Sequence, residues 1–134
     1  MKFKILPIAG DASFRTFYRL ILNKNSKIIV IAKKKKYTNL IAYSTINKFL
    51  RVNKILAPKL YTYNFSKGLI VIEDFGDTSF YKELHKKKNK LLVYKRLVDL
   101  LLKIQKIKSK IKIKNINNGS HIIDKYSNKY LFKE

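Results

Sequence analysis

The chain has 134 residues, enough for one modest domain or one lobe of a larger protein, and 46% of them are apolar, which excludes wholesale disorder. It contains no cysteine, so disulfides, thiolate metal sites and a cysteine nucleophile are excluded. No apolar run approaches the roughly 18 residues of a membrane span, so we expect a cytoplasmic protein without membrane contact.

Residues 3–9 and 14–22 are predicted to form two antiparallel strands around a short loop. The loop consists of Gly10, Asp11, Ala12 and Ser13. Because Gly10 has no Cβ, the backbone can lie close over a phosphate, and Ser13 and the neighbouring amides supply hydrogen-bond donors. As a bare pattern, the same residue types between two strands usually form an ordinary hairpin turn.

Three more strands and one helix are predicted in the next segment. Residues 27–32 form the third strand, with a continuous apolar centre. Residues 39–54 then change to helical spacing, which places several apolar side chains on one face. These side chains are Leu40, Tyr43, Ile46, Phe49 and Leu50. Strands over residues 59–65 and 69–72 follow, so the order is three strands, one helix and two strands.

An acidic stretch at residues 73–77 ends the last strand, and the chain after it is predicted to be helical over 79–87 and 89–108. The second helix carries a broad apolar stripe, and helices of this kind normally pack against more protein. From residue 110 the sequence is rich in Ile, Lys and Asn, with a short helix predicted at its end.

Three segments carry a family resemblance. The Gly-Asp-Ala-Ser-Phe-Arg run at 10–15 and its flanks resemble the nucleotide loop of the aminoglycoside phosphotransferase family, which has a kinase-like fold. Ala57-Pro58 and the Glu-Asp-Phe-Gly run at 73–76 are similar to a later pattern of that family. The resemblance covers about residues 5–105 and is strongest to bacterial kinases that phosphorylate the cell-wall amino sugars N-acetylmuramate and N-acetylglucosamine.

The resemblance implies an α+β fold in two parts. Residues 1–75 would be the nucleotide-binding N-terminal lobe of a protein-kinase-like fold, a five-stranded antiparallel sheet with one packed helix. Residues 76–134 would be the hinge and the first helices of an incomplete C-terminal lobe.

The resemblance also implies a set of contacts to ATP. The backbone of residues 10–13 would close over the phosphates, and the backbone of Glu73, Asp74 and Phe75 would hydrogen-bond adenine.

A lysine after the third strand is implied to hold the phosphates, and two lysines compete for that role. Residues 30–33 resemble the kinase V-A-I-K run, which favours Lys33. The spacing from Ala32 instead favours Lys34, because side chains two apart on a strand share a face. The sequence leaves both open.

The chain departs from the family pattern in two ways. The helix at 39–54 has no Asp or Glu, so the usual lysine–glutamate ion pair cannot form from it. His121, Asp124 and Asn128 mimic the family's H-x-D-x-x-x-x-N loop, but both spacings differ by one. We interpret His121 as a loop histidine and His85 as a solvated helix residue. The catalytic base and the magnesium ligands are expected outside this sequence, so the chain alone is predicted to be inactive.

The predicted function is the ATP-binding portion of a small-molecule, amino-sugar phosphotransferase. ATP and magnesium are its expected cofactors, and a sugar acceptor and the missing lobe its expected partners. One alternative is a small basic nucleic-acid-binding protein, indicated by the net charge of +23 and by nine Tyr and eight Phe. Lys, Ile and Asn are abundant in every segment, however, which is typical of AT-rich coding bias, so no specific nucleic acid is expected. A noncatalytic interaction remnant is a further alternative.

Overall fold

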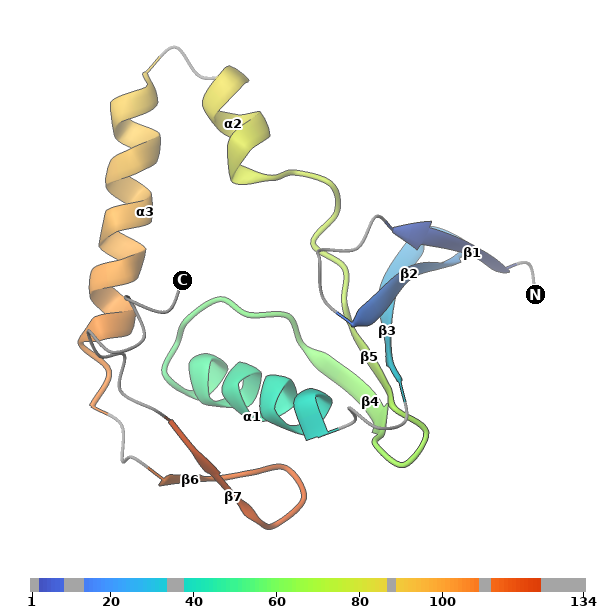
Figure 1. The fold of residues 1–134 in the computed structure, drawn as a ribbon. Helices are drawn as coiled ribbons and strands as arrows, with labels where there is room; N and C mark the ends of the chain where they lie inside the picture. Colours follow the sequence, from blue (N-terminus) through green and yellow to red (C-terminus); the bar gives the residue numbers. More distant parts are fainter. Residues whose placement is uncertain (1–2, 9–13, 34–37, 87–88, 109–111, 124–134) are drawn as a thin grey trace.

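The computed structural model describes residues 3–8, 14–33, 38–86, 89–108 and 112–123. Within these residues the chain forms an α+β fold with a five-stranded antiparallel sheet, three helices and a small two-stranded hairpin (Figure 1). The fold class and the five-stranded antiparallel sheet expected from the sequence are therefore confirmed. None of the helices in the described ranges is long and apolar enough to cross a membrane.

The sheet has the strand order β1-β2-β3-β5-β4, and each neighbouring pair is antiparallel. Its strands are β1 (Phe3–Ile8), β2 (Arg15–Leu22), β3 (Asn25–Ala32), β4 (Leu60–Asn64) and β5 (Leu69–Glu73). β3 begins two residues earlier than predicted, because Asn23 adopts a positive φ of 54° and closes a two-residue turn. Asn25 then pairs directly with Leu22.

One face of the sheet carries the core, and α1 (Thr38–Val52) packs against it (Figure 1). The core cluster comprises Ile28, Val30, Ala32, Leu40, Phe65, Ile70 and Ile72. Leu40 of α1 is fully buried among the strand residues, as the helical spacing over 39–54 predicts. The helix ends at Val52, and Lys54 follows with a positive φ of 60°.

Helices α2 (Phe80–Lys86) and α3 (Lys90–Gln105) lie where the sequence predicts helices, with ends one to three residues inside the predicted ones. They contact each other through the rings of Phe80 and Tyr94, which meet edge to face with centroids 6.4 Å apart. The Asn89 side chain caps α3 by accepting a hydrogen bond from the backbone N–H three residues on. In Figure 1 both helices stand to one side of the sheet, beyond the segment that leaves β5.

The hairpin of β6 (Lys112–Lys114) and β7 (Ser120–Ile122) occupies a segment for which the sequence predicted no strand. Its turn is organised by Asn115, whose side-chain oxygen accepts hydrogen bonds of 2.9 Å from the backbone N–H groups of Asn117 and Gly119. Ile116 in this turn packs against the core cluster of the large sheet. The short helix predicted at the end of the sequence lies outside the described residues.

The backbone of Gly68 lies very close to the backbone of Ala32 at the end of β3. Its φ is +65°, and a Cβ added there would lie 2.4 Å from the Ala32 carbonyl oxygen. The Ala32 N–H also donates a 2.8 Å hydrogen bond to the Gly68 carbonyl oxygen. We expect Gly68→Ala to lower the free energy of unfolding by about 3 kcal/mol, through backbone strain and the clash together. Urea denaturation followed by circular dichroism measures this loss.

The matched control is Gly76→Ala. Gly76 also has a positive φ, of 76°, but an added Cβ there meets nothing within 4 Å. Only the backbone strain of about 1 kcal/mol should then remain. Equal losses for the two variants would contradict the close approach of Gly68 to β3.

Candidate functional site

The β2 strand presents three long side chains on the inner face of the sheet. Arg15, Phe17 and Arg19 alternate along the strand and therefore share a face. Phe17 lies opposite Val30 and Arg19 opposite Ile28, both of which belong to the core cluster. β2 thus places two cations and one aromatic ring along the edge of the core.

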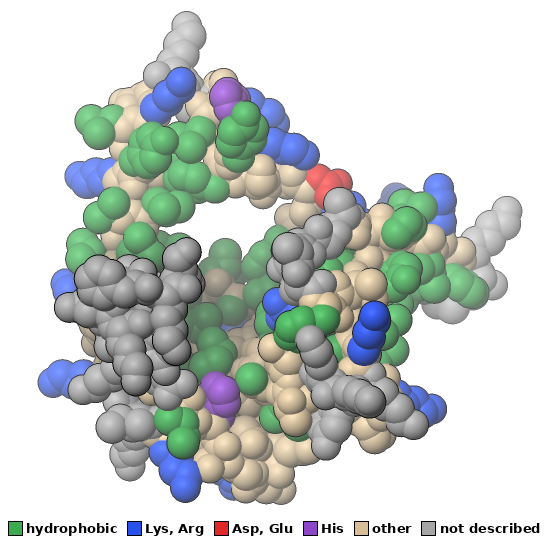
Figure 2. Space-filling model, viewed as in Figure 1, with side chains coloured by type: hydrophobic (Ala, Val, Ile, Leu, Met, Phe, Trp, Pro, Cys, Tyr) green, Lys and Arg blue, Asp and Glu red, His purple; other side chains and the backbone are tan. Residues whose placement is uncertain are grey.

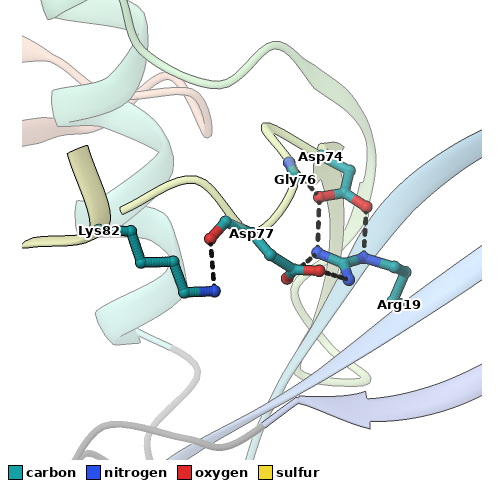
Figure 3. A network of polar contacts seen from close by, with 5 residues as sticks. All are labelled: Arg19, Asp74, Gly76, Asp77 and Lys82. Carbon is teal, nitrogen blue, oxygen red and sulfur yellow. Dashed lines mark hydrogen bonds and ion pairs between the residues drawn. The ribbon is translucent and has the colours of Figure 1, made fainter. Parts of the chain in front are cut away.

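Arg19 joins the sheet to the chain after β5 (Figure 3). Its Nε and Nη2 donate to the two carboxylate oxygens of Asp74, at 2.6 and 3.1 Å. Its Nη1 and Nη2 donate to those of Asp77, at 3.0 and 2.9 Å. One guanidinium therefore holds two carboxylates in paired hydrogen bonds, the strongest geometry for this ion pair. We call this arrangement the hinge clamp.

Two further contacts support the hinge clamp. The Gly76 N–H donates to Asp74 Oδ1 at 2.8 Å, and Gly76 adopts a positive φ that lets the chain turn back on that carboxylate. Lys82, at the start of α2, donates from Nζ to the Asp77 carbonyl oxygen at 3.0 Å. The hinge clamp therefore reaches from β2 to α2.

The hinge clamp shifts the pKa values of its members. Burial of the Asp74 side chain, which is 2% exposed, acts to raise its pKa, but hydrogen bonds from Arg19, Ser26 and Gly76 outweigh this and hold the pKa below its ordinary value. The hydrogen bond from Arg19 lowers the pKa of Asp77 as well. The hydrogen bonds to Asp77 and Asp74 raise the pKa of Arg19, so all three groups stay charged at neutral pH.

Glu73, the last residue of β5, is tied to the neighbouring edge of the sheet. Its N–H donates to the Lys59 carbonyl oxygen at 2.8 Å, and its Oε2 accepts from the Lys59 N–H at 2.9 Å. The Arg51 guanidinium lies 3.9 Å from the same carboxylate oxygen. The Glu73 side chain thus has a structural partner just before β4, while its backbone continues into the hinge.

A cavity of about 380 Å³ lies between the inner face of the sheet and the hinge. Its apolar wall comes from the first three strands and from β5, and its other wall is the hinge itself. The lining residues are Ile8, Phe17, Arg19, Ile28, Pro58, Ile72, Glu73, Asp74, Phe75, Gly76 and Asp77. The hinge clamp therefore forms one side of this cavity, which we call the hinge cavity.

Two larger cavities flank α1. One, of about 580 Å³, lies between α1, β4 and Ile116. The other, of about 490 Å³, lies between α1 and the segment 56–58, and Arg15 borders it. We call this second one the helix cavity. Pro58 lines both the hinge cavity and the helix cavity.

Some of the site residues predicted from the sequence lie in the described part of the chain. Glu73, Asp74 and Phe75 all border the hinge cavity. Lys33 is exposed and directly follows the end of β3 at Ala32, whose own side chain is buried. The remaining predicted site residues, Gly10, Asp11, Ala12, Ser13 and Lys34, lie outside the described residues.

The two histidines lie away from the hinge cavity lining. His85 is exposed on α2 and stacks edge to face against Tyr81, as expected of a solvated helix residue. His121 lies in β7, opposite Ile113, so the prediction of a loop histidine is wrong. The described part of the chain contains no group of three or more His, Cys, Asp or Glu side chains suited to hold a metal ion.

Positive charge does not gather in one groove on the face shown in Figure 2. Lys and Arg side chains are scattered around the periphery of this face, over the helices, the hairpin and the sheet. The red patch in the upper right part of this view belongs to the acidic hinge region beside the sheet. The pattern on this face is that of a generally basic surface.

Sequence reasoning missed two of the three side chains that make the hinge clamp, Arg19 and Asp77, and identified only Asp74 as a site residue. One signal was present: Glu73, Asp74 and Asp77 are three of only eight acidic residues in a chain of charge +23. Acidic residues gathered in so basic a chain indicate a specific cationic partner. Alternation in β2 further places Arg19 on the face of Phe17.

No family model matches this chain, and no curated protein matches it either. The family resemblance therefore rests on the quoted motifs alone. What it implies about activity is a proposal, argued below from the hinge and its cavity.

The hinge clamp predicts a specific acid sensitivity. A carboxylate with a lowered pKa stabilises the fold above its ordinary pKa of about 3.9, and this contribution is lost as the pH falls through the lower, folded-state value. We expect Asp74→Asn to reduce the free energy of unfolding by about 2 kcal/mol at pH 7. The difference between wild type and variant should stay constant down to about pH 5 and shrink below about pH 4.

Urea unfolding at a series of pH values measures this dependence. Asp99→Asn removes the same charge from an exposed position on α3 and should leave the stability at pH 7 nearly unchanged. A difference between wild type and Asp74→Asn that did not shrink in acid would contradict an ionic role for Asp74.

Proposed function

We propose that this chain is the ATP-binding portion of a small-molecule phosphotransferase of kinase-like fold. Residues 1–75 would form its nucleotide-binding lobe, and residues 76–134 the hinge and the first helices of a second lobe. Amino sugars such as N-acetylmuramate and N-acetylglucosamine are the acceptors that the sequence resemblance favours.

The hinge cavity is the observation that carries the proposal. A purine ring needs apolar surfaces for its two faces and backbone hydrogen-bonding groups along its edge. Ile8, Phe17, Ile28 and Ile72 supply apolar walls, and Glu73, Asp74 and Phe75 border the same space. The hinge clamp holds Asp74 in position from β2.

The order of the elements supports the same proposal. Strand, loop, strand, strand, helix, strand, strand and acidic hinge is the order of the small lobe of a kinase-like fold, and the described residues follow it from β1 to α2. The helix between β3 and β4 packs on the sheet, as that lobe requires. Fold analogy is a weaker support than the cavity, because one fold hosts many functions.

The surface of α3 supports a second lobe. Its apolar residues cover more than half of the helix circumference, and most are exposed. The exposed ones are Leu91, Leu92, Tyr94, Val98, Leu100, Leu101, Leu102 and Ile104. A helix with apolar side chains around so much of its surface is normally buried in a larger domain. A catalytic lobe packed around α3 would cover these side chains.

Magnesium, which phosphoryl transfer requires, does not fit the described residues. Three carboxylates line the hinge cavity. All four oxygens of Asp74 and Asp77 accept hydrogen bonds from Arg19, and Glu73 Oε2 accepts one from the Lys59 N–H. Exchanging this cation for a metal would leave the guanidinium half-buried without its partners. The described chain therefore contributes nucleotide contacts to the reaction, with the metal ligands and the base supplied by the second lobe.

Blocking the hinge cavity tests the proposal. We expect Ile8→Trp to weaken adenosine binding at least about tenfold, because the larger ring fills space at the cavity wall. Ile5→Trp is the matched control, since Ile5 lies on the other face of β1 and is exposed. Isothermal calorimetry of the full chain with adenosine gives both affinities. Equal effects of the two variants, or no binding by the wild type, would sink the proposal.

Phosphate transfer is a separate expectation. We expect no measurable transfer from ATP to N-acetylmuramate or N-acetylglucosamine by this 134-residue chain alone. His121 lies in a hairpin strand, and the described residues hold no metal-binding group. A coupled assay of ADP release with each sugar, in the presence of magnesium, measures the rate. Turnover that depends on His121 would show that the hairpin carries catalytic groups.

A further inference from the structure

The five-stranded sheet is apolar on both of its faces. In β3, Ile28 and Val30 belong to the core cluster, while Ile29 and Ile31 alternate with them and face the other way. An antiparallel sheet commonly buries one face and presents polar side chains on the other, and a continuous apolar run is typical of a strand covered on both sides. We call the side of the sheet away from the core cluster the outer face.

The register of the strands aligns a row of side chains across the outer face. Pro7 of β1 lies opposite Tyr18 of β2, which in turn lies opposite Ile29 of β3. Ile29 lies opposite Val71 of β5, and Val71 lies opposite Thr62 of β4. Side chains opposite one another in neighbouring strands are close enough to interact. The row therefore makes an apolar surface across the sheet that ends at the threonine of β4.

Several apolar side chains beside this row are exposed. Ile5 is 48% exposed, Ile31 is 37% exposed, and Phe3 at the start of β1 is 66% exposed. In Figure 1 the helices and the small hairpin lie to the left of β1, β2 and β3, and α1 packs on the inner face of the sheet. The outer face is therefore an apolar patch that is open to solvent in the single chain.

The outer face carries no net charge, although the net charge of the chain is +23. Within the five strands, Lys27 and Glu73 are the only charged residues at positions that alternate away from the core, and they lie directly opposite each other. Depletion of charged residues and enrichment of aromatic ones mark the centre of a protein–protein interface. A nucleic acid or an anionic membrane would need cations at the contact. The outer face therefore suits a protein surface that is itself apolar and uncharged.

A second copy of this chain supplies such a surface. Two sheet faces pack about 10 Å apart with their side chains interdigitated, and a two-fold axis places the same patch on both sides of the contact. The exposed apolar surface of α3 is less suited to self-association, because that helix carries four Lys or Arg residues and one Asp. Two chains of charge +23 therefore meet with less repulsion between their contact surfaces at the outer face than at α3.

The size of the outer face fits a weak dimer. Five strands about 4.8 Å apart and about 20 Å long cover roughly 400 to 500 Å² in projection, and the accessible area of their side chains exceeds this projection. A specific interface of standard size buries about 800 Å² on each partner. The outer face thus reaches the low end of specific interfaces, which corresponds to reversible association.

We propose that two copies of this chain pack through their outer faces and form a weak, two-fold symmetric dimer. The hinge cavity lies on the inner side of each sheet, so both cavities stay open in the dimer. The dimer does not depend on what the hinge cavity binds.

Sedimentation velocity of the full chain, over a range of concentrations and salt, tests the dimer. We expect a reversible monomer–dimer equilibrium with a dissociation constant of roughly 10 to 100 µM at about 0.5 M salt. The dimer should weaken several-fold at about 0.05 M salt, because the repulsion between two positive chains is then less screened. Association that weakens as salt rises would indicate contact between cations and acidic groups and would overturn the proposal. A wild type that stays monomeric up to about 300 µM would overturn it as well.

A charge placed on the outer face should disrupt the dimer. Ile31→Lys puts a cation on the middle strand of the outer face, and we expect it to raise the dissociation constant at least about tenfold. Leu102→Lys is the matched control, because it adds the same charge to an exposed apolar position of α3. It should change the dissociation constant less than about twofold. Circular dichroism melts verify that both variants are folded.

Ile5→Lys repeats the measurement if Ile31→Lys fails to fold. Ile5 is an exposed residue of the edge strand β1 and lies opposite Leu20 on the outer face. This variant should raise the dissociation constant at least about fivefold. Equal effects of the outer-face and α3 variants would overturn the proposal. A dimer that is lost in Leu102→Lys and kept in the outer-face variants would place the contact on α3 and overturn it too.

Discussion

The position of the hinge depends on one guanidinium. Arg19 holds Asp74 and Asp77 in a shared set of hydrogen bonds, and Asp74 is almost fully buried within it. Buried ion pairs add little net stability, because desolvation offsets much of their attraction, but they penalise every arrangement that separates the charges. The planar fork of arginine adds a directional requirement that lysine cannot meet. The hinge clamp therefore specifies where the chain leaves the sheet, and with it the shape of the hinge cavity.

The β2 strand serves the core and the site together. Its inward side chains alternate between a charge, an aromatic ring and a second charge, and the aromatic ring packs against the core. Because the side-chain period of a strand is two, a slip of β2 by one residue would turn all three outward. Pairing with both β1 and β3 fixes the register on both sides of the strand. The geometry of the proposed site is thus set by backbone hydrogen bonding as much as by the side chains themselves.

The sheet and α1 could be predicted because their apolar periodicity is local and strong. The continuous apolar centre of β3 and the helical spacing from Leu40 onward each identify an element within about a dozen residues. The hairpin at residues 112–122 was missed because strands of three residues are too short to establish a period. The hinge clamp joins positions 55 and 58 residues apart in sequence, and a pairing over that distance leaves no local pattern. The start of β3 was predicted two residues too late for a local reason, the left-handed conformation of Asn23.

The packing of Ile116 against the core has a consequence for how the chain moves. The polypeptide departs from the sheet at the hinge clamp, passes through α2 and α3, and returns so that Ile116 completes the core beside α1. The segment from the hinge to Ile116 is therefore anchored at both ends to the sheet and its core. A segment held at two points is less free to swing than one held at a single end. The position of α3 relative to the sheet is therefore restrained from both sides, through the hinge clamp and through Ile116.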